Sequence, residues 1–191
     1  ESPLDMRMDR GREGATAARL LATLPAAELE RVFSEYGELP GARRLARAIV
    51  AHRETGPLAT AADLIALIQG AGIGHGRSHN PATLVFQALR IAVNDELAAL
   101  EEGLEAAVRV LRPGGRLVVL TYHSLEDRIV KRALRSAAKG CVCPPSFPVC
   151  RCGIAPRLAL ATRRPIEPSA REIEQNARAR SARLRAAIRL E

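Results

Sequence analysis

Apolar and polar positions divide the chain into a helical first part and a mixed second part. Between residues 15 and 70, apolar side chains recur every three or four positions, which is the period of one buried helix face. This pattern predicts helices at residues 16–24, 26–36, 42–52 and 61–69, preceded by a polar loop. The first part is therefore expected to be a small helical subdomain.

A glycine-rich stretch at residues 70–76 follows the apolar run 64–68 and has two interpretations. It could be the phosphate loop of a nucleotide-binding unit, which requires a strand before the glycines. Thr60 and Asp63, however, have the spacing of a capping box, so the apolar run is better interpreted as a helix that ends at Gly70. We therefore favour a flexible connector.

A long helix is predicted from Pro81 to Leu111, because asparagine at position 80 is a good N-cap and proline is favoured at the first helical position. Gln87, Arg90 and Asn94 recur at steps of three and four residues and so lie along one side of this helix. Their side chains could contact a substrate, or they could equally bond to neighbouring loops.

The pattern then changes to that of a strand. Residues 113–115 end the helix, and the short apolar run 117–120 predicts a buried strand. Ser124 and Asp127 have capping-box spacing, so a new helix is expected over residues 125–138, directly after the carboxyl end of the strand. The alternation of helices and strands predicts an α/β fold, in which ligands bind at this edge of the sheet.

From Pro156 onward the chain is rich in arginine, with nine arginines against four glutamates. A strand is expected within residues 157–164, and Ser169 with Glu172 predicts the start of a short helix. Residues 178–185 fit a helix by propensity, but the alternation of basic and small side chains also fits an edge strand.

Composition narrows the classes of partner. The chain has 191 residues, of which 47% are hydrophobic and 3% aromatic, and its formal net charge is +8. The charge favours an anionic partner, nucleic acid before membrane, although the abundance of arginine can equally reflect genome composition. No apolar run approaches the length of a membrane span and the first residues lack a signal-peptide pattern, so we expect a cytoplasmic protein with no membrane partner.

All four cysteines lie in one loop, residues 141–152: Cys141, Cys143, Cys150 and Cys152. Stable disulfides are not expected in a reducing compartment, whereas four thiolates could hold zinc. Zinc sites more often have C-x-x-C spacing, and this loop has C-x-C. We therefore favour a proline-stiffened loop with reduced thiols and assign no metal site, with zinc as the open alternative.

Several blocks of the sequence are informative when they are taken together. In chain order they are residues 3–9, 86–97, 123–128, the cysteine loop, 164–166 and 176–185. Together these blocks resemble the bacterial family of methyltransferases that modify N4 of a cytosine in 16S ribosomal RNA. Blocks in this order are far more specific than any single motif, and the resemblance covers nearly the whole chain.

The resemblance implies a Rossmann-like methyltransferase that uses S-adenosylmethionine, acts on 16S ribosomal RNA in the small subunit, and carries a helical substrate-recognition insert. On that template, residues 1–14 are a loop from the first half of the catalytic domain, residues 15–78 the insert, and residues 79–191 the second half, ending in a strand. The family's glycine-rich cofactor loop and ribose-binding acid precede the first block, so we expect a part of a longer enzyme. A homodimer is an open alternative for its oligomeric state.

The chemistry of that reaction suggests roles for particular residues. A cytosine amino group is weakly nucleophilic because its lone pair is delocalised, so catalysis needs a group that orients the N–H and a base that can be reached. We predict His123, Glu126 and Asp127 as catalytic acceptors or orienting groups. The alternative is that Ser124 and Asp127 only cap a helix while Glu126 pairs with an arginine.

The candidate substrate-binding residues are basic or amide side chains: Arg90, Asn94, Arg163, Arg164, Arg178, Arg180, Arg183 and Arg185. Guanidinium groups along one hairpin edge would suit bidentate contacts with phosphates, whereas a competing interpretation pairs them with Glu167, Glu172 and Glu174. Two other classes of protein also stay open, a non-catalytic RNA-binding or ribosome-assembly module and a zinc-binding domain.

Overall fold

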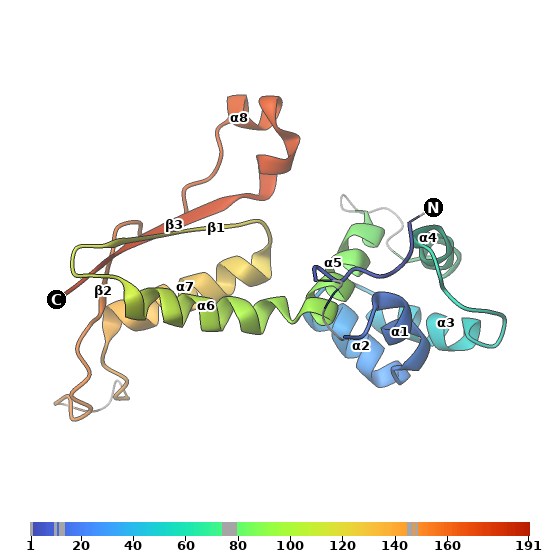
Figure 1. Cartoon of the computed structure of the whole chain (residues 1–191), viewed down its shortest axis with the longest axis horizontal. Coiled ribbons are helices and arrows are strands. Elements are labelled where there is room, and N and C mark those ends of the chain that lie inside the picture. Colours follow the sequence, from blue (N-terminus) through green and yellow to red (C-terminus); the bar gives the residue numbers. More distant parts are fainter. Residues whose placement is uncertain (1, 10, 12–13, 74–79, 145–146, 148) are drawn as a thin grey trace. The chain divides into compact units, whose positions relative to one another are not determined.

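The computed structural model describes every residue except 1, 10, 12–13, 74–79, 145–146 and 148 (Figure 1). The chain forms two compact units, Glu1–Glu96 and Leu97–Glu191, and each has its own hydrophobic cluster. Two predictions fall on residues outside the described part. They are the domain boundary between residues 78 and 79, and the part of the glycine stretch at residues 74–76.

The first unit is built from helices. They are α1 (Ala17–Thr23), α2 (Ala26–Glu35), α3 (Ala42–His52), α4 (Ala61–Gly70) and α5 (Pro81–Asn94). The predicted capping box of α4 is confirmed, because Thr60 Oγ1 accepts from the Asp63 N–H (3.2 Å) and the Asp63 carboxylate accepts from the Thr60 N–H (2.8 Å). The run before Gly70 is thus a helix, so the strand that a phosphate loop requires is not there.

The core of the first unit lies among these helices. Phe33 of α2, Ile49 of α3 and Leu89 of α5 are fully buried in one cluster. The segment before α1 is tied to the same core, since the buried Leu4 donates its N–H to the carbonyl of Ala59 (3.0 Å).

The predicted single helix from Pro81 to Leu111 is wrong, because it is broken into two. α5 ends at Asn94, Asp95 adopts a left-handed conformation with φ of 50°, and α6 (Glu96–Val110) follows. Aspartate is one of the few residues that tolerate this conformation. Buried residues of α5 such as Leu89 belong to the cluster of the first unit, whereas those of α6 belong to the cluster of the second unit.

The second unit contains an antiparallel three-stranded sheet in the order β1-β3-β2. Both β1 (Arg116–Thr121) and β2 (Leu158–Leu160) run antiparallel to β3 (Arg183–Arg189), so they run in the same direction, and α7 (Ser124–Lys139) connects them. Figure 1 shows α6 and α7 on one side of this sheet, where residues of both helices share a core cluster with Leu158 and Ala187. The predicted α/β class is therefore confirmed at the level of mixed helices and strands.

Two predictions for the second unit are corrected. β1 is covered on one face only, because Leu117 and Val119 pack against the core cluster while Val118 and Leu120 are about half exposed. The arginine-rich end contains the strand that the resemblance implied, but β3 lies between β1 and β2 and is not an edge strand. After α8 (Ala170–Gln175), a short 3₁₀ helix, η1 (Ala177–Ser181), precedes it.

Candidate functional site

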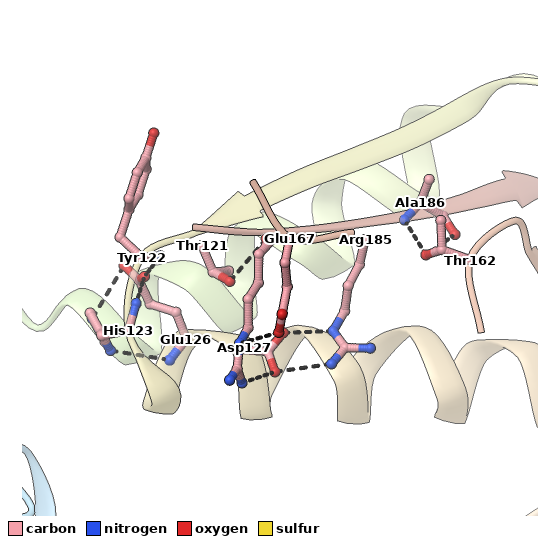
Figure 2. Close-up of polar contacts among 10 residues, drawn as sticks. Thr121, Tyr122, His123, Glu126, Asp127, Thr162, Glu167, Arg185 and Ala186 are labelled. Carbon is pink, nitrogen blue, oxygen red and sulfur yellow. Dashed lines mark hydrogen bonds and ion pairs between the residues drawn. The ribbon is translucent and has the colours of Figure 1, made fainter. Parts of the chain in front are cut away.

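The carboxyl end of β1 leads directly into a capped helix (Figure 2). The N-cap of α7 is His123, whose Nδ1 accepts from the Glu126 N–H at 3.4 Å. In return, the Glu126 carboxylate accepts from the N–H groups of Tyr122 (2.8 Å) and His123 (3.3 Å). The predicted cap at Ser124 is thus wrong by one residue, because an imidazole nitrogen takes the place of the usual hydroxyl or carboxylate.

The second nitrogen of His123 also faces Glu126. Nε2 lies 3.3 Å from Glu126 Oε1, and within the described residues no hydrogen bond of good geometry reaches this buried nitrogen. Partial burial raises the pKa of Glu126, but the contact with the His123 ring and the backbone N–H groups of Tyr122 and His123 outweigh it and bring the pKa below its usual range. Glu126 is therefore an anchored carboxylate that stays ionised at neutral pH.

Asp127 lies one residue further along α7 and makes a different contact. Arg185 donates to both of its oxygens, from Nε to Oδ1 at 2.7 Å and from Nη2 to Oδ2 at 2.9 Å, and both side chains are at least nine-tenths buried (Figure 2). Arg183 adds a longer bond of 3.3 Å from Nη1 to Oδ2. The carboxylate of Asp127 thus ties α7 to β3.

This ion pair corrects two predictions. Asp127 is not a capping residue, because its carboxylate pairs with Arg185. The guanidinium of Arg185 is buried against Asp127 and is therefore not exposed to bind a phosphate. Arg183 is about half exposed and lies 3.8 Å from Glu167, as the competing interpretation expected for that residue. Both arginines therefore have partners within the fold.

Tyr122 was not predicted as a site residue from the sequence. Its side chain is 53% exposed directly before the cap, and Figure 2 shows its ring pointing away from His123 and Glu126. Glu126 fixes the backbone of Tyr122 through the N–H. An exposed aromatic ring on a rigid turn offers a stacking face for a base. The signal was available, since the chain has only two tyrosines and one of them precedes the strand-end histidine.

In the first unit, the polar side of α5 bonds to neighbouring segments. Asn94 accepts the Met8 N–H through Oδ1 (2.8 Å) and donates through Nδ2 to the carbonyl of Met6 (2.9 Å). Arg90 donates to both oxygens of Glu96 at 2.7 and 2.9 Å. These contacts match the second of the two predicted alternatives, and a substrate role for Arg90 and Asn94 stays a prediction.

Four of the predicted phosphate-binding arginines remain exposed: Arg163, Arg164, Arg178 and Arg180. They form no ion pair within the described part of the chain. Arg178 and Arg180 flank the buried Ala179 on η1, so both point outward from the same short helix. They are the better candidates for RNA contact, although they do not share one hairpin edge with Arg163 and Arg164.

The second unit is thus a mixed α/β structure in which β1 leads into α7 through a turn with polar side chains. A sequence profile of the MraW methylase family matches residues 1–190. The chain therefore belongs to the MraW methylase family, and the resemblance drawn from its motif blocks is confirmed.

Relatives with the name "Ribosomal RNA small subunit methyltransferase H" are similar over nearly the whole chain. The protein of Thermomicrobium roseum is 56% identical over 189 residues, which are 98% of this chain and 57% of the relative. That of Carboxydothermus hydrogenoformans is 51% identical over 191 residues, 100% of this chain and 61% of the relative. The chain thus spans less than two thirds of the length of these relatives.

A helix that crosses a bilayer must be both long and apolar. Within the residues that the structure describes, no helix combines the length and the apolar character that a membrane span needs.

Proposed function

We propose that the chain is part of an S-adenosylmethionine-dependent methyltransferase that modifies N4 of a cytosine in 16S ribosomal RNA of the small subunit, in the cytoplasm. The observation that carries this proposal is the family match over residues 1–190, together with relatives named for methylation of small-subunit ribosomal RNA. The parallel course of β1 and β2, joined by α7, supports a Rossmann-like second half. In this proposal, residues 15–78 are the helical insert.

S-adenosylmethionine would supply the methyl group from its sulfonium. The described residues at the end of β1 do not fit as a cradle for it, because Glu126 is used by the helix cap and Asp127 by Arg185. We therefore assign no cofactor ligand in this chain, and the proposal for its residues concerns the base.

The turn after β1 is the proposed place for the target cytosine. The exposed ring of Tyr122 would stack on the base. Oε1 of Glu126, the oxygen that accepts neither N–H group of the cap, would accept a hydrogen bond from the N4 amino group. His123 acts as a positioning residue, since its ring holds Glu126 at the cap. Asp127 positions the same helix from the other side through Arg185.

The test is methyl transfer by the full-length protein to small subunits that lack the modification. Labelled S-adenosylmethionine should deliver its methyl group to cytosine, and mass spectrometry of nucleosides should identify N4-methylcytidine. Label on another nucleoside would overturn the proposed activity. Salt-sensitive RNA binding without any methyl transfer would instead favour the non-catalytic assembly module.

Variants of Tyr122 test the proposed base-binding role separately. Tyr122→Ala should lower kcat/KM by about 5- to 150-fold, the equivalent of about 1–3 kcal/mol of base stacking. Tyr122→Phe keeps the ring and should stay close to the wild type, and Tyr36→Phe in the first unit controls for loss of a tyrosine hydroxyl. Full activity of the alanine variant would remove the stacking role and leave the proposed reaction intact.

A further inference from the structure

We propose that Cys141, Cys143, Cys150 and Cys152 form a zinc site with four thiolate ligands. Their Sγ atoms all lie within 4.8 Å of one another, with Cys150 and Cys152 at 3.4 Å and Cys143 and Cys150 at 4.0 Å. A tetrahedral ion with Zn–S bonds of about 2.3 Å places its sulfurs about 3.8 Å apart. The observed separations lie around that value.

The separations do not fit disulfides. A disulfide joins two sulfurs at about 2.05 Å, and all four cysteines are free thiols here. The Sγ atoms of Cys150 and Cys152 are 3.4 Å apart, well beyond the length of a covalent bond. Four sulfurs that converge without bonding to one another form a donor set of the right kind and number for a closed structural zinc site.

A backbone N–H group is directed at one of the sulfurs, as thiolate ligands require. Arg151 donates its N–H to Cys143 Sγ at 3.4 Å. Four thiolates around a divalent cation leave a net negative charge, which such donors offset.

The closeness of the four sulfurs itself favours a cation. Thiolates whose Sγ atoms all lie within 4.8 Å of one another would repel, and a divalent cation between them removes this repulsion.

The fold explains why the loop closes at this place. Gly140 ends α7 with φ of 69°, and a Cβ at this position would lie 2.5 Å from the backbone nitrogen of Pro156. Nearby, Arg157 donates its N–H to the carbonyl of Ala137 at 2.8 Å. The two ends of the loop are thus held together, and both C-x-C pairs lie close to this closed base. Zinc would then fix the connection between α7 and β2.

The proposal does not depend on the enzymatic activity, and metal content tests it. The purified protein, kept in a reducing buffer without chelator, should contain about one zinc ion per chain by elemental mass spectrometry. The double variant Cys143→Ser, Cys150→Ser should lose the metal, whereas Val149→Ala, which alters an exposed side chain between these ligands, should retain it.

Cobalt gives a second measurement on the unaltered protein, in case the double variant does not fold. Cobalt-loaded protein should show the intense sulfur-to-cobalt charge-transfer bands and the visible bands of a tetrahedral thiolate complex. Protein that holds no zinc, and whose cysteines react with a thiol reagent as fast as in the unfolded chain, would overturn the proposal. A mass that shows disulfides within the loop would overturn it as well.

Discussion

Replacing Asp127 with asparagine should destabilise the second unit, because the guanidinium of Arg185 would stay buried without its counter-charge. The side chains of Asp127 and Arg185 are 7% and 10% exposed, and two hydrogen bonds join them. Removing one partner of a buried ion pair costs about 3–5 kcal/mol. A mere capping role would predict a nearly silent change, because asparagine is itself a good N-cap.

Hydrogen exchange measures this destabilisation locally. Amide protection in β3 and α7 should fall by roughly two to three and a half orders of magnitude, which is the change in free energy converted at about 1.4 kcal/mol per tenfold. Helices α1–α4 of the first unit serve as an internal control. The double variant Asp127→Leu, Arg185→Met replaces the pair with apolar groups and should recover most of the protection. Protection in β3 that changes by less than about threefold in Asp127→Asn would refute the reasoning.

The same pair gives a dependence on pH. Hydrogen bonds from Arg185 lower the pKa of Asp127 below its ordinary value of 3.8, against the effect of burial, and Arg183 adds to the lowering. A lowered folded-state pKa means that the stabilisation is fully present above that ordinary value and is lost as the pH falls through the folded pKa. Protection in β3 of the wild type should therefore decline in acid below about pH 4. The asparagine variant should lack this component, so parallel acid profiles would contradict the assignment.

The helices and their caps were predictable because the signals are local. The bounds of α3 follow from apolar spacing within the helix, and the Thr60–Asp63 capping box lies within four residues. The cap of α7 shows the limit of the same rule. Two overlapping pairs, Ser124 with Asp127 and His123 with Glu126, have the required spacing, and residue statistics favour serine over histidine.

The roles of the charged residues were not predictable, because they depend on contacts across long stretches of chain. Arg185 meets Asp127 across 58 positions. Which arginines of β3 turn inward is set by its register with β1, where Val119 pairs with Arg185 and Thr121 with Arg183. Alternation along the strand suggested an exposed basic edge, and only the pairing shows that one of its members is buried against α7.

Three other changes test separate parts of the structure. Gly140→Ala should lower the melting temperature, because φ is 69° and the new Cβ would lie 2.5 Å from the backbone nitrogen of Pro156. The same change at Gly103, a helical position with nothing within 4 Å of the new Cβ, should raise the melting temperature slightly. Asn94→Ala removes the bonds to Met6 and Met8 and should speed proteolysis of residues 5–9 about tenfold or more, at about 1 kcal/mol per hydrogen bond; an unaltered cleavage rate would contradict the role of Asn94 as a clamp. The last change removes Arg178 and Arg180, which are exposed on η1 without an ion pair in the described residues. Because phosphate contacts carry no base information, the double alanine variant should weaken binding to small subunits and to unrelated RNA alike. The slope of log affinity against log salt should become shallower by about 0.7–0.9 for each phosphate that the variant no longer neutralises. The control variant replaces Arg109 and Arg112, which are exposed at the end of α6 and just after it, with alanine, and it lowers the net charge equally. An identical change of slope in both variants would show a general charge effect. It would exclude η1 as a specific RNA-binding surface.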